Sequence, residues 1–232
     1  GDMTYEFDFA TVLAAWPQFL AGAWLTIQLS FPATVLGFVA GTLLAIGRRG
    51  SVRWVSRACG AYVEIIRNTP LLVQVFLVFF GLATLGFKVS AFTAALASLV
   101  INVAAYSCEI MRAGMDSIHK GQLEAAECLG LSRRQIYWHV ILRPAMEKVW
   151  PALTSQFVLL MLASSITSQI SVEELTAAAA RVQSDTFRPF EAYILVAVAY
   201  LALSLLMRVG LWLFGLAVFT RKRRLAAQGG AR

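Results

Sequence analysis

The sequence predicts an all-α membrane protein with about five transmembrane helices. Hydrophobic residues make up 59% of the 232 positions, charged residues only 14%, and the mean hydropathy is +0.69. A water-soluble domain of this length needs more polar surface to cover its core. Several apolar runs also reach the roughly 20 residues that a helix needs to cross a bilayer core of about 30 Å. Finally, the basic residues behind the net charge of +7 lie in short tracts between these runs, which favours orientation in a membrane over binding of nucleic acid.

Five apolar runs define the expected spans, within one transmembrane domain that covers residues 1–232. The runs lie at about 20–46, 58–83, 90–111, 150–171 and 191–214. In the first run, Gly37 and Gly41 form a GxxxG pattern. This pattern permits the close approach of another helix, or it reflects the ordinary tolerance of glycine in membrane helices.

The distribution of charge predicts the orientation of the chain. One set of connections is strongly basic: Arg48, Arg49, Arg53, Arg57, Arg112, Lys120, Arg133, Arg134, Arg143, Lys148, Arg221, Lys222, Arg223, Arg224 and Arg232. The opposite set has three basic residues and is mainly acidic: Lys88, Arg181, Arg188, Asp2, Glu6, Asp8, Glu173, Glu174, Asp185 and Glu191. By the positive-inside rule the basic set is cytoplasmic. We therefore expect the N-terminus outside and the C-terminus in the cytoplasm, as an odd number of spans also requires.

The longest connection, at about 112–149, lies between the third and fourth spans on the cytoplasmic side. A loop of that length is usually functional or separately folded. Gly130 suits the end of a helix, and Ser132 with Gln135 forms a capping box for the next one. The sequence therefore predicts a helix at 121–129, a turn at 130–131, and a second helix from 133 to about 142, where Pro144 follows at the entrance to the fourth span.

The informative residues of this connection are Glu124, Ala125 and Ala126, followed by Gly130 and Leu131. Two adjacent alanines on a short helix present a flat patch that another protein can approach, and Glu124 adds a charge for a hydrogen-bonded contact. Glu-Ala-Ala is also simply good helix-forming sequence, and alone it does not distinguish the two interpretations.

In its context the segment resembles the EAA loop of the permease subunits of ABC importers, and the resemblance covers nearly the whole chain. Four further segments resemble the polar amino acid branch of that family: Gly22, Leu25, Thr26, Leu29 and Ser30; Tyr62, Val63, Glu64, Arg67, Thr69, Pro70, Leu71, Leu72, Val73 and Gln74; Ala105, Tyr106, Glu109, Arg112, Gly114, Ile118, Lys120, Gly121 and Gln122; and Thr186, Phe187, Arg188, Pro189 and Phe190.

The resemblance implies a permease subunit of the bacterial inner membrane that moves a polar or charged amino acid, or a closely related compound, by alternating access. Its expected partners are two copies of an ABC ATPase, which binds ATP and Mg²⁺, a second permease, an external solute-binding protein and the lipid bilayer. Glu124, Ala125, Ala126, Gly130 and Leu131 would form the coupling element. This chain itself is expected to be no enzyme and to hold no cofactor.

The sequence departs from the family pattern in the fourth span. Many members carry Lys-Asp where this chain has Leu162 and Ala163. A path for a charged substrate needs polar groups, because unpaired charges in a low dielectric cost several kcal/mol. We therefore expect a non-identical second permease that supplies them. The alternative is a homodimer that relies on the binding protein for selection.

Two charged pairs have helical spacing, namely Glu64 with Arg67 and Glu109 with Arg112. Residues three apart are neighbours on a helix, and a charge in the membrane is expensive unless it is paired or near the interface. Each pair is either a salt bridge that ties helix ends together or part of an inner gate.

Polar residues in the apolar runs are candidates for a translocation path: Asn102, Ser164, Thr167, Ser168, Gln169 and Ser171. In lipid such side chains turn inward, where they line a path or form hydrogen bonds between helices. Both interpretations stay open.

Other functional classes find little support in the sequence. It contains no HExxH, GxSxG or GxxxxGK[ST] pattern, so we expect no catalytic residues, no metal site and no ATP-binding loop. Cys59, Cys108 and Cys128 lack ligand spacing and are expected to be free thiols. A membrane scaffold or a self-sufficient channel is the alternative function, but neither needs a docking site for a motor.

Overall fold

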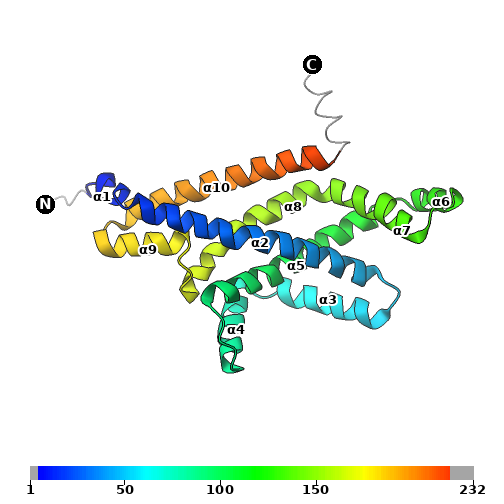
Figure 1. The fold of residues 1–232 in the computed structure, drawn as a ribbon, viewed down its shortest axis with the longest axis horizontal. Helices are drawn as coiled ribbons and strands as arrows, with labels where there is room; N and C mark the ends of the chain where they lie inside the picture. The colour runs from blue at the N-terminus through cyan, green and yellow to red at the C-terminus, as the bar shows by residue number, and fades with distance from the viewer. Residues whose placement is uncertain (1–4, 220–232) are drawn as a thin grey trace, which may run out of the picture. The chain divides into compact units, whose positions relative to one another are not determined.

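The computed structural model describes residues 5–219, and throughout that part of the chain the regular structure is helical. The helices are α1 (Phe9–Leu13), α2 (Trp16–Arg49), α3 (Arg53–Arg67), α4 (Leu71–Thr84), α5 (Ala91–Asp116), α6 (Lys120–Cys128), α7 (Arg133–Gln135), the π-helix η1 (Ile136–Leu142), α8 (Arg143–Ala163), the 3₁₀ helix η2 (Ser164–Ile170), α9 (Leu175–Thr186) and α10 (Pro189–Val218) (Figure 1). The all-α prediction is confirmed.

The chain packs as two compact units, and four long helices contribute residues to both. Unit 1 comprises residues 1–34, 69–100 and 159–206, and unit 2 comprises 35–68, 101–158 and 207–232. The shared helices are α2, α5, α8 and α10. The expectation of a single transmembrane domain stays a prediction.

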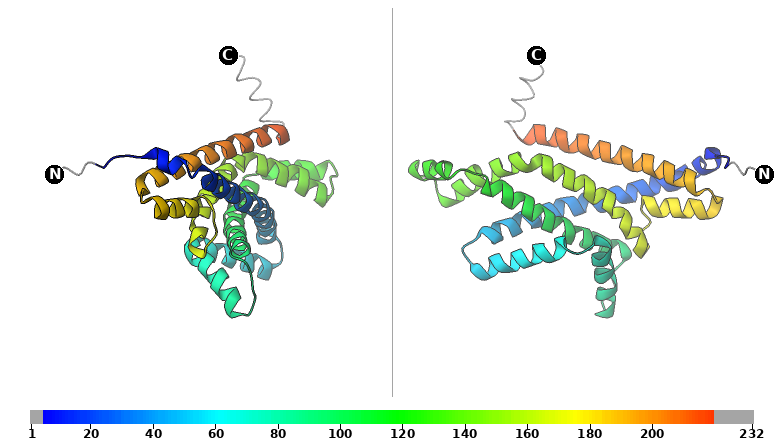
Figure 2. Two further views of the ribbon diagram at one scale, coloured as in Figure 1. Left: turned by 60° about the vertical axis from the view of Figure 1, so that its left-hand side comes forward. Right: turned by 180° about the vertical axis from the view of Figure 1, so that it is seen from behind.

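In unit 1, α9 lies beside the N-terminal half of α2 (Figure 2). A Cβ on Gly22 would lie 2.9 Å from the Cα of Leu175, so the absence of a side chain permits this close approach. Leu175, Ala179 and Val196 form a buried core, onto which Phe19 packs. The backbone N–H of Leu175 also donates to Thr26 Oγ1, at 3.2 Å.

In unit 2, α3 runs back along the C-terminal half of α2. Ser56 Oγ donates to the carbonyl of Arg48 at 2.6 Å, and a Cβ on Gly47 would touch the sulfur of Cys59. A second cluster surrounds Trp150 of α8, whose indole N–H donates to the carbonyl of Leu211 at 3.0 Å. The ring of Trp150 also lies 5.4 Å from that of Phe214.

The expected spans are confirmed in four cases, and the second span is different. Four helical stretches are long and apolar enough to cross a membrane: 16–49, 91–116, 133–170 and 189–218. The predicted single helix at 58–83 is wrong, because the chain breaks between Arg67 and Leu71 into α3 and α4. Thr69 precedes Pro70, and a residue before proline is disfavoured in the helical region, which favours a break at this point. With α3 and α4 taken as one bent span, the count is five.

The long connection is also more helical than the sequence suggests. We expected spans that ended near residue 111 and resumed near 150, but α5 runs to Asp116 and a helix runs from Arg133 through η1 into α8. The prediction that the second helix stops near residue 142 is wrong, because the helix continues through Pro144. A proline inside a helix clashes with the carbonyl four residues earlier. The wider turns of η1 end at Leu142, two residues before Pro144, and the Arg143 N–H donates five residues back, to the Trp138 carbonyl. Wider turns of this kind give the proline ring room in the helix.

Candidate functional site: the α6 turn and the ion network of unit 2

The turn after α6 closes as the sequence predicts. Gly130 has φ +72, and its N–H donates to the carbonyl of Glu127 at 2.9 Å. The N–H of Leu131 donates to the carbonyl of Ala126 at 3.2 Å. These two bonds form a Schellman motif, for which glycine is preferred because a Cβ disfavours positive φ. The turn therefore fixes the direction in which the chain leaves α6.

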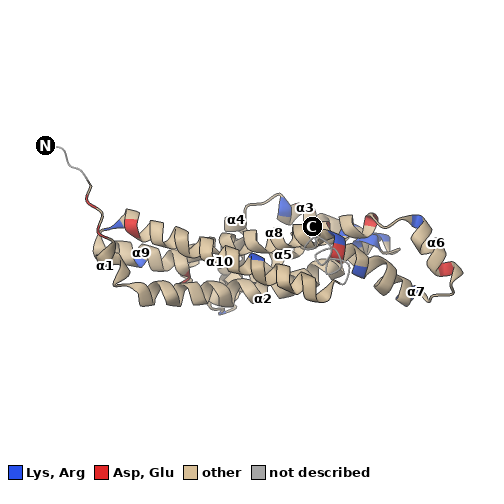
Figure 3. Cartoon of the chain, turned by 90° about the horizontal axis from the view of Figure 1, so that it is seen from above, with Lys and Arg blue, Asp and Glu red and all other residues tan. Residues whose placement is uncertain are grey.

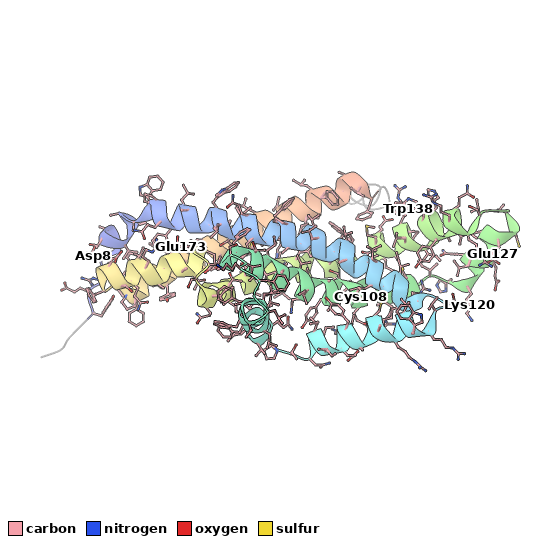
Figure 4. The ribbon with its side chains drawn as sticks, turned by 60° about the horizontal axis from the view of Figure 1, so that its bottom comes forward. Asp8, Cys108, Lys120, Glu127, Trp138 and Glu173 are labelled. Carbon is pink, nitrogen blue, oxygen red and sulfur yellow. The ribbon has the colours of Figure 1, made fainter. Side chains whose placement is uncertain are left out.

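The helix after the turn begins at the expected cap. Ser132 N–H donates to Gln135 Oε1 at 2.9 Å, and Gln135 N–H donates to Ser132 Oγ at 3.4 Å. The capping box is confirmed, and α6 packs against η1, which follows directly. In Figure 4, Lys120 and Glu127 mark the two ends of α6, and Trp138 lies on the returning helix.

The candidate coupling residues do not share one face of α6. Glu124 and Ala125 are exposed, whereas Ala126 is only 4% exposed. The expectation that both alanines form the exposed patch is therefore wrong: Ala126 is a small residue in the packed interior of unit 2. Beyond the helix, Leu129 is 80% exposed and Leu131 is also exposed. The accessible surface thus combines a small side chain, a carboxylate and two leucines, a composition suited to contact with another protein.

An ion network joins the C-terminal ends of α2 and α5. Arg48 Nη1 donates to Glu109 Oε2 at 2.5 Å, and Arg112 donates to Glu109 Oε1. Arg112 also contacts Asp116 at 2.8 Å, and Arg49 contacts Asp116 at 3.0 Å. The expected neighbour pair of Glu109 and Arg112 is present, but as the middle of a five-residue network. Sequence reasoning missed Arg48, Arg49 and Asp116 as partners, although their place beside the ends of two apolar runs was a signal.

The second charged pair has different contacts. Within the part of the chain that the structure describes, Glu64 and Arg67 form no ion pair with each other. The guanidinium of Arg67 instead lies over the ring of Tyr106, 5.5 Å from its centroid. Asn68 Nδ2 donates to Glu64 Oε2 at 3.2 Å. A role of either pair in an inner gate stays a prediction.

The hydroxyl groups of the fourth span donate mainly to backbone carbonyls of their own helix. Ser164 Oγ donates to the carbonyl of Met161 at 2.6 Å, Thr167 Oγ1 to that of Ser164 at 2.7 Å, and Ser168 Oγ to that of Ser165 at 2.8 Å. Ser164 and Thr167 are fully buried. Gln169 and Ser171 are exposed, and Ser171 has φ +65. Asn102 belongs to unit 2 and the other five to unit 1. Their part in a translocation path stays a prediction.

A buried carboxylate at the start of α9 was also missed. Glu174 is fully buried and accepts from the N–H groups of Thr176 and Ala177, at 2.9 and 3.0 Å. Tyr200 Oη donates to it at 2.5 Å. Burial raises the pKa of Glu174 above its ordinary value, and these hydrogen bonds oppose the rise. The sequence does not indicate which carboxylate of the adjacent pair Glu173 and Glu174 is buried.

Charged residues gather in two places. Within unit 2, Figure 3 shows them on and beside α6 and α7, and within unit 1 near α1 and α9. The cytoplasmic side that the positive-inside rule assigns to the basic residues of unit 2 stays a prediction. Among the described residues, no group of three or more His, Cys, Asp or Glu side chains could hold a metal ion.

Helices long and apolar enough to cross a membrane identify the class of protein as a multi-span membrane protein. Residues 33–216 match the family described as binding-protein-dependent transport system inner membrane component. The chain belongs to this family. Its members are permease subunits of transport systems in the inner membrane, and the permease is not an enzyme.

Individual relatives of this chain are also transport system permeases. The chain is 34% identical to the nopaline transport system permease protein NocM of Agrobacterium fabrum, over 84% of this chain and 85% of that protein. It is also 34% identical to the glutamine transport system permease protein GlnP of Escherichia coli, over 87% of this chain and 93% of that protein. A solved amino acid ABC transporter matches with a TM-score of 0.83 and 36% identity, covering 91% of this chain and 99% of that one. The methionine transporter MetNI, at 21% identity and a TM-score of 0.70, shares the fold.

Proposed function

We propose that this chain is the permease subunit of an ATP-driven importer for a polar or charged amino acid, or a closely related compound such as an opine. The relatives NocM and GlnP are named for nopaline and glutamine, and the solved structure of an amino acid ABC transporter shares 36% of its sequence. Transport in this family depends on a binding protein, which we expect to deliver the substrate. The permease then opens its path alternately to the two sides of the membrane.

The α6 turn is the proposed coupling element. ATP and Mg²⁺ would be bound by two ATPase subunits, and Glu124, Ala125, Gly130 and Leu131 would carry their motion into the permease. The exposed surface of α6, continued by Leu129 at 80% exposure, supports this assignment. It is the single observation that carries the proposal, because large apolar side chains on an aqueous surface mark a protein contact. Ala126 takes a supporting part by allowing α6 to pack closely on its own unit.

A substitution on the exposed face of α6 tests the coupling element. We expect Ala125→Arg to insert normally but to lose transport, because a large charged side chain blocks the close approach of the ATPase. The matched control is Ala125→Ser, which keeps the side chain small. Co-purification of the ATPase and substrate uptake into proteoliposomes are measured together. Wild-type uptake by Ala125→Arg, with its ATPase bound, would show that α6 is not the coupling element.

We further propose that the second permease is a different chain. Leu162 and Ala163 leave this stretch without charge, and the hydroxyls of Ser164, Thr167 and Ser168 already bond to backbone carbonyls. A partner permease would supply charged groups for the substrate. Purification through a tag on this chain should yield two permease species. A single species with full transport after reconstitution would contradict the heterodimer.

A further inference from the structure

The turn between α9 and α10 holds a bulky residue in a backbone conformation that glycine normally occupies. Phe187 has φ +55, and its N–H closes α9 by donating to the carbonyl of Gln183 at 2.8 Å. A side chain at positive φ is strained, and for a phenylalanine this conformation is an outlier. Phe187 is also 85% exposed, so packing within unit 1 does not compensate the strain. Strained residues of this kind concentrate at functional sites.

The base of this turn is held by a network of polar contacts within unit 1. Arg188 Nη1 donates to the carbonyl of Glu6 at 2.6 Å and lies 3.7 Å from Glu191. Glu191 is fully buried and accepts from Tyr5 Oη at 2.5 Å and from the N–H of Asp8 at 2.9 Å. These contacts tie the turn to the N-terminal segment, so that the ring of Phe187 projects from a fixed base.

The turn that carries Phe187 is bordered by exposed polar and acidic residues. Glu6, Ser184 and Asp185 are exposed beside the turn, as is the aromatic ring of Phe190. An apolar group with a polar rim marks a protein interaction site. A continuous apolar row, as expected for a lipid-facing surface, is exposed along α10 from Phe190 through Ile194, Val198, Leu201 and Leu205. The charge bias of the sequence assigns the α9–α10 turn to the external side.

We propose that Phe187 is the anchor by which the external binding protein docks on this chain. The ring would enter an apolar pocket of the binding protein, edged by basic or hydrogen-bond-donating groups that match Asp185 and Glu6. This docking mode rests on the proposed function. Transport in the family depends on a binding protein. A rigidly presented aromatic side chain loses little conformational entropy on docking, which makes it an efficient anchor.

The variant Phe187→Asn removes the aromatic ring but keeps the backbone conformation, because asparagine tolerates positive φ. The assay uses the full complex in proteoliposomes and the binding protein that stimulates the wild-type ATPase. We expect an unchanged basal ATPase rate, a melting temperature equal to or above wild type, and a rise of at least tenfold in the binding-protein concentration that gives half-maximal stimulation. Phe187→Trp should retain stimulation. The control Trp54→Asn removes another exposed aromatic residue, in unit 2, and should leave the concentration unchanged.

A photo-reactive benzoylphenylalanine in place of Phe187 gives a second readout, with cross-linking to the binding protein as the expected result. An unchanged half-maximal concentration for Phe187→Asn would overturn the proposal. So would cross-links confined to lipid or to the second permease. A wild-type complex that no binding protein stimulates would instead refute the proposed function itself, and the two failures are thus distinct.

Discussion

At the scale of single residues, Gly41 shows how closely α2 and α5 pack in unit 2. A Cβ at this position would lie 2.6 Å from both the carbonyl oxygen of Ala104 and the Cβ of Ser107, and 2.9 Å from the backbone nitrogen of Cys108. Two of these atoms belong to the backbone of a helix and cannot move independently. The GxxxG pattern therefore marks a true helix contact at Gly41, and it is not merely a tolerated glycine.

We expect Gly41→Ala to lower the free energy of unfolding by about 1–3 kcal/mol, the usual cost of overpacking. The matched control is Gly210→Ala on α10, where a Cβ would meet nothing within 4 Å. Thermal unfolding of both variants in detergent, followed by tryptophan fluorescence, measures the difference. Equal melting temperatures for the two variants would contradict the close contact.

Glu109 is the second decisive residue, because it accepts from both Arg48 and Arg112. We expect Glu109→Gln to cost about 1–3 kcal/mol, since hydrogen bonds to charged groups are lost and two arginines remain close together. Arg49→Gln is the control: its partner Asp116 is 45% exposed, and a surface pair contributes about 0–1 kcal/mol. Melting temperatures at low and high salt distinguish the two. An effect of Arg49→Gln as large as that of Glu109→Gln would argue against Glu109 as the centre of the network.

At the scale of elements, α9 depends on a carboxylate at its start. Glu174 caps the helix through the N–H groups of Thr176 and Ala177, and its burial raises its pKa from the ordinary value of 4.5. A carboxyl group with a raised folded-state pKa stabilises the fold below the unfolded pKa. That contribution is lost as the pH rises through the folded-state pKa.

The variant Glu174→Gln carries no charge at any pH. We therefore expect the stability of the wild type, relative to this variant, to fall as the pH rises from below 4.5 through the raised pKa of Glu174. Melting temperatures of both proteins over this range give the comparison. Glu174→Ala should be less stable than wild type throughout, by about 0.5–2 kcal/mol, because the cap itself is lost. Parallel pH curves for wild type and Glu174→Gln would contradict the raised pKa.

Local signals in the sequence predicted local structure well. Gly130 and the pair Ser132–Gln135 specify a helix end and a helix start through bonds that reach no more than five residues along the chain. The break at Pro70 was missed because a long apolar run outweighed the rule for the residue before a proline. The continuation through Pro144 was missed because only the packed structure shows that η1 accommodates the ring.

Contacts between distant segments were harder to predict. Arg48 and Glu109 are 61 residues apart, and nothing local selects one carboxylate for a given arginine. The family pattern identified the α6 segment as a candidate site, but it did not separate exposed Ala125 from buried Ala126. The two alanines differ because α6 packs on η1. Helix propensity does not predict which face of a helix is packed.

At the scale of the whole molecule, the charge bias and the odd number of spans predict the topology. Cysteine labelling of intact cells should find Asp185→Cys accessible from outside and Gly50→Cys only after permeabilisation. Leu225→Cys, which lies outside the described residues, should behave like Gly50→Cys. Labelling of Leu225→Cys or Gly50→Cys from outside would contradict the predicted orientation and with it the count of five spans.

The network of Arg48 and Glu109 also has a consequence for biogenesis. Chains are synthesised at about 5–20 residues per second, so Arg48 is synthesised about 3–12 s before Glu109. During that interval the C-terminal end of α2 holds two arginines without the carboxylates that pair with them. The arrival of α5 then supplies Glu109 and Asp116 together, and we expect these ion pairs to fix α2 against α5. A nascent chain stalled before residue 109 should therefore leave α2 free to shift along the membrane normal, and one stalled after residue 116 and fully emerged should not.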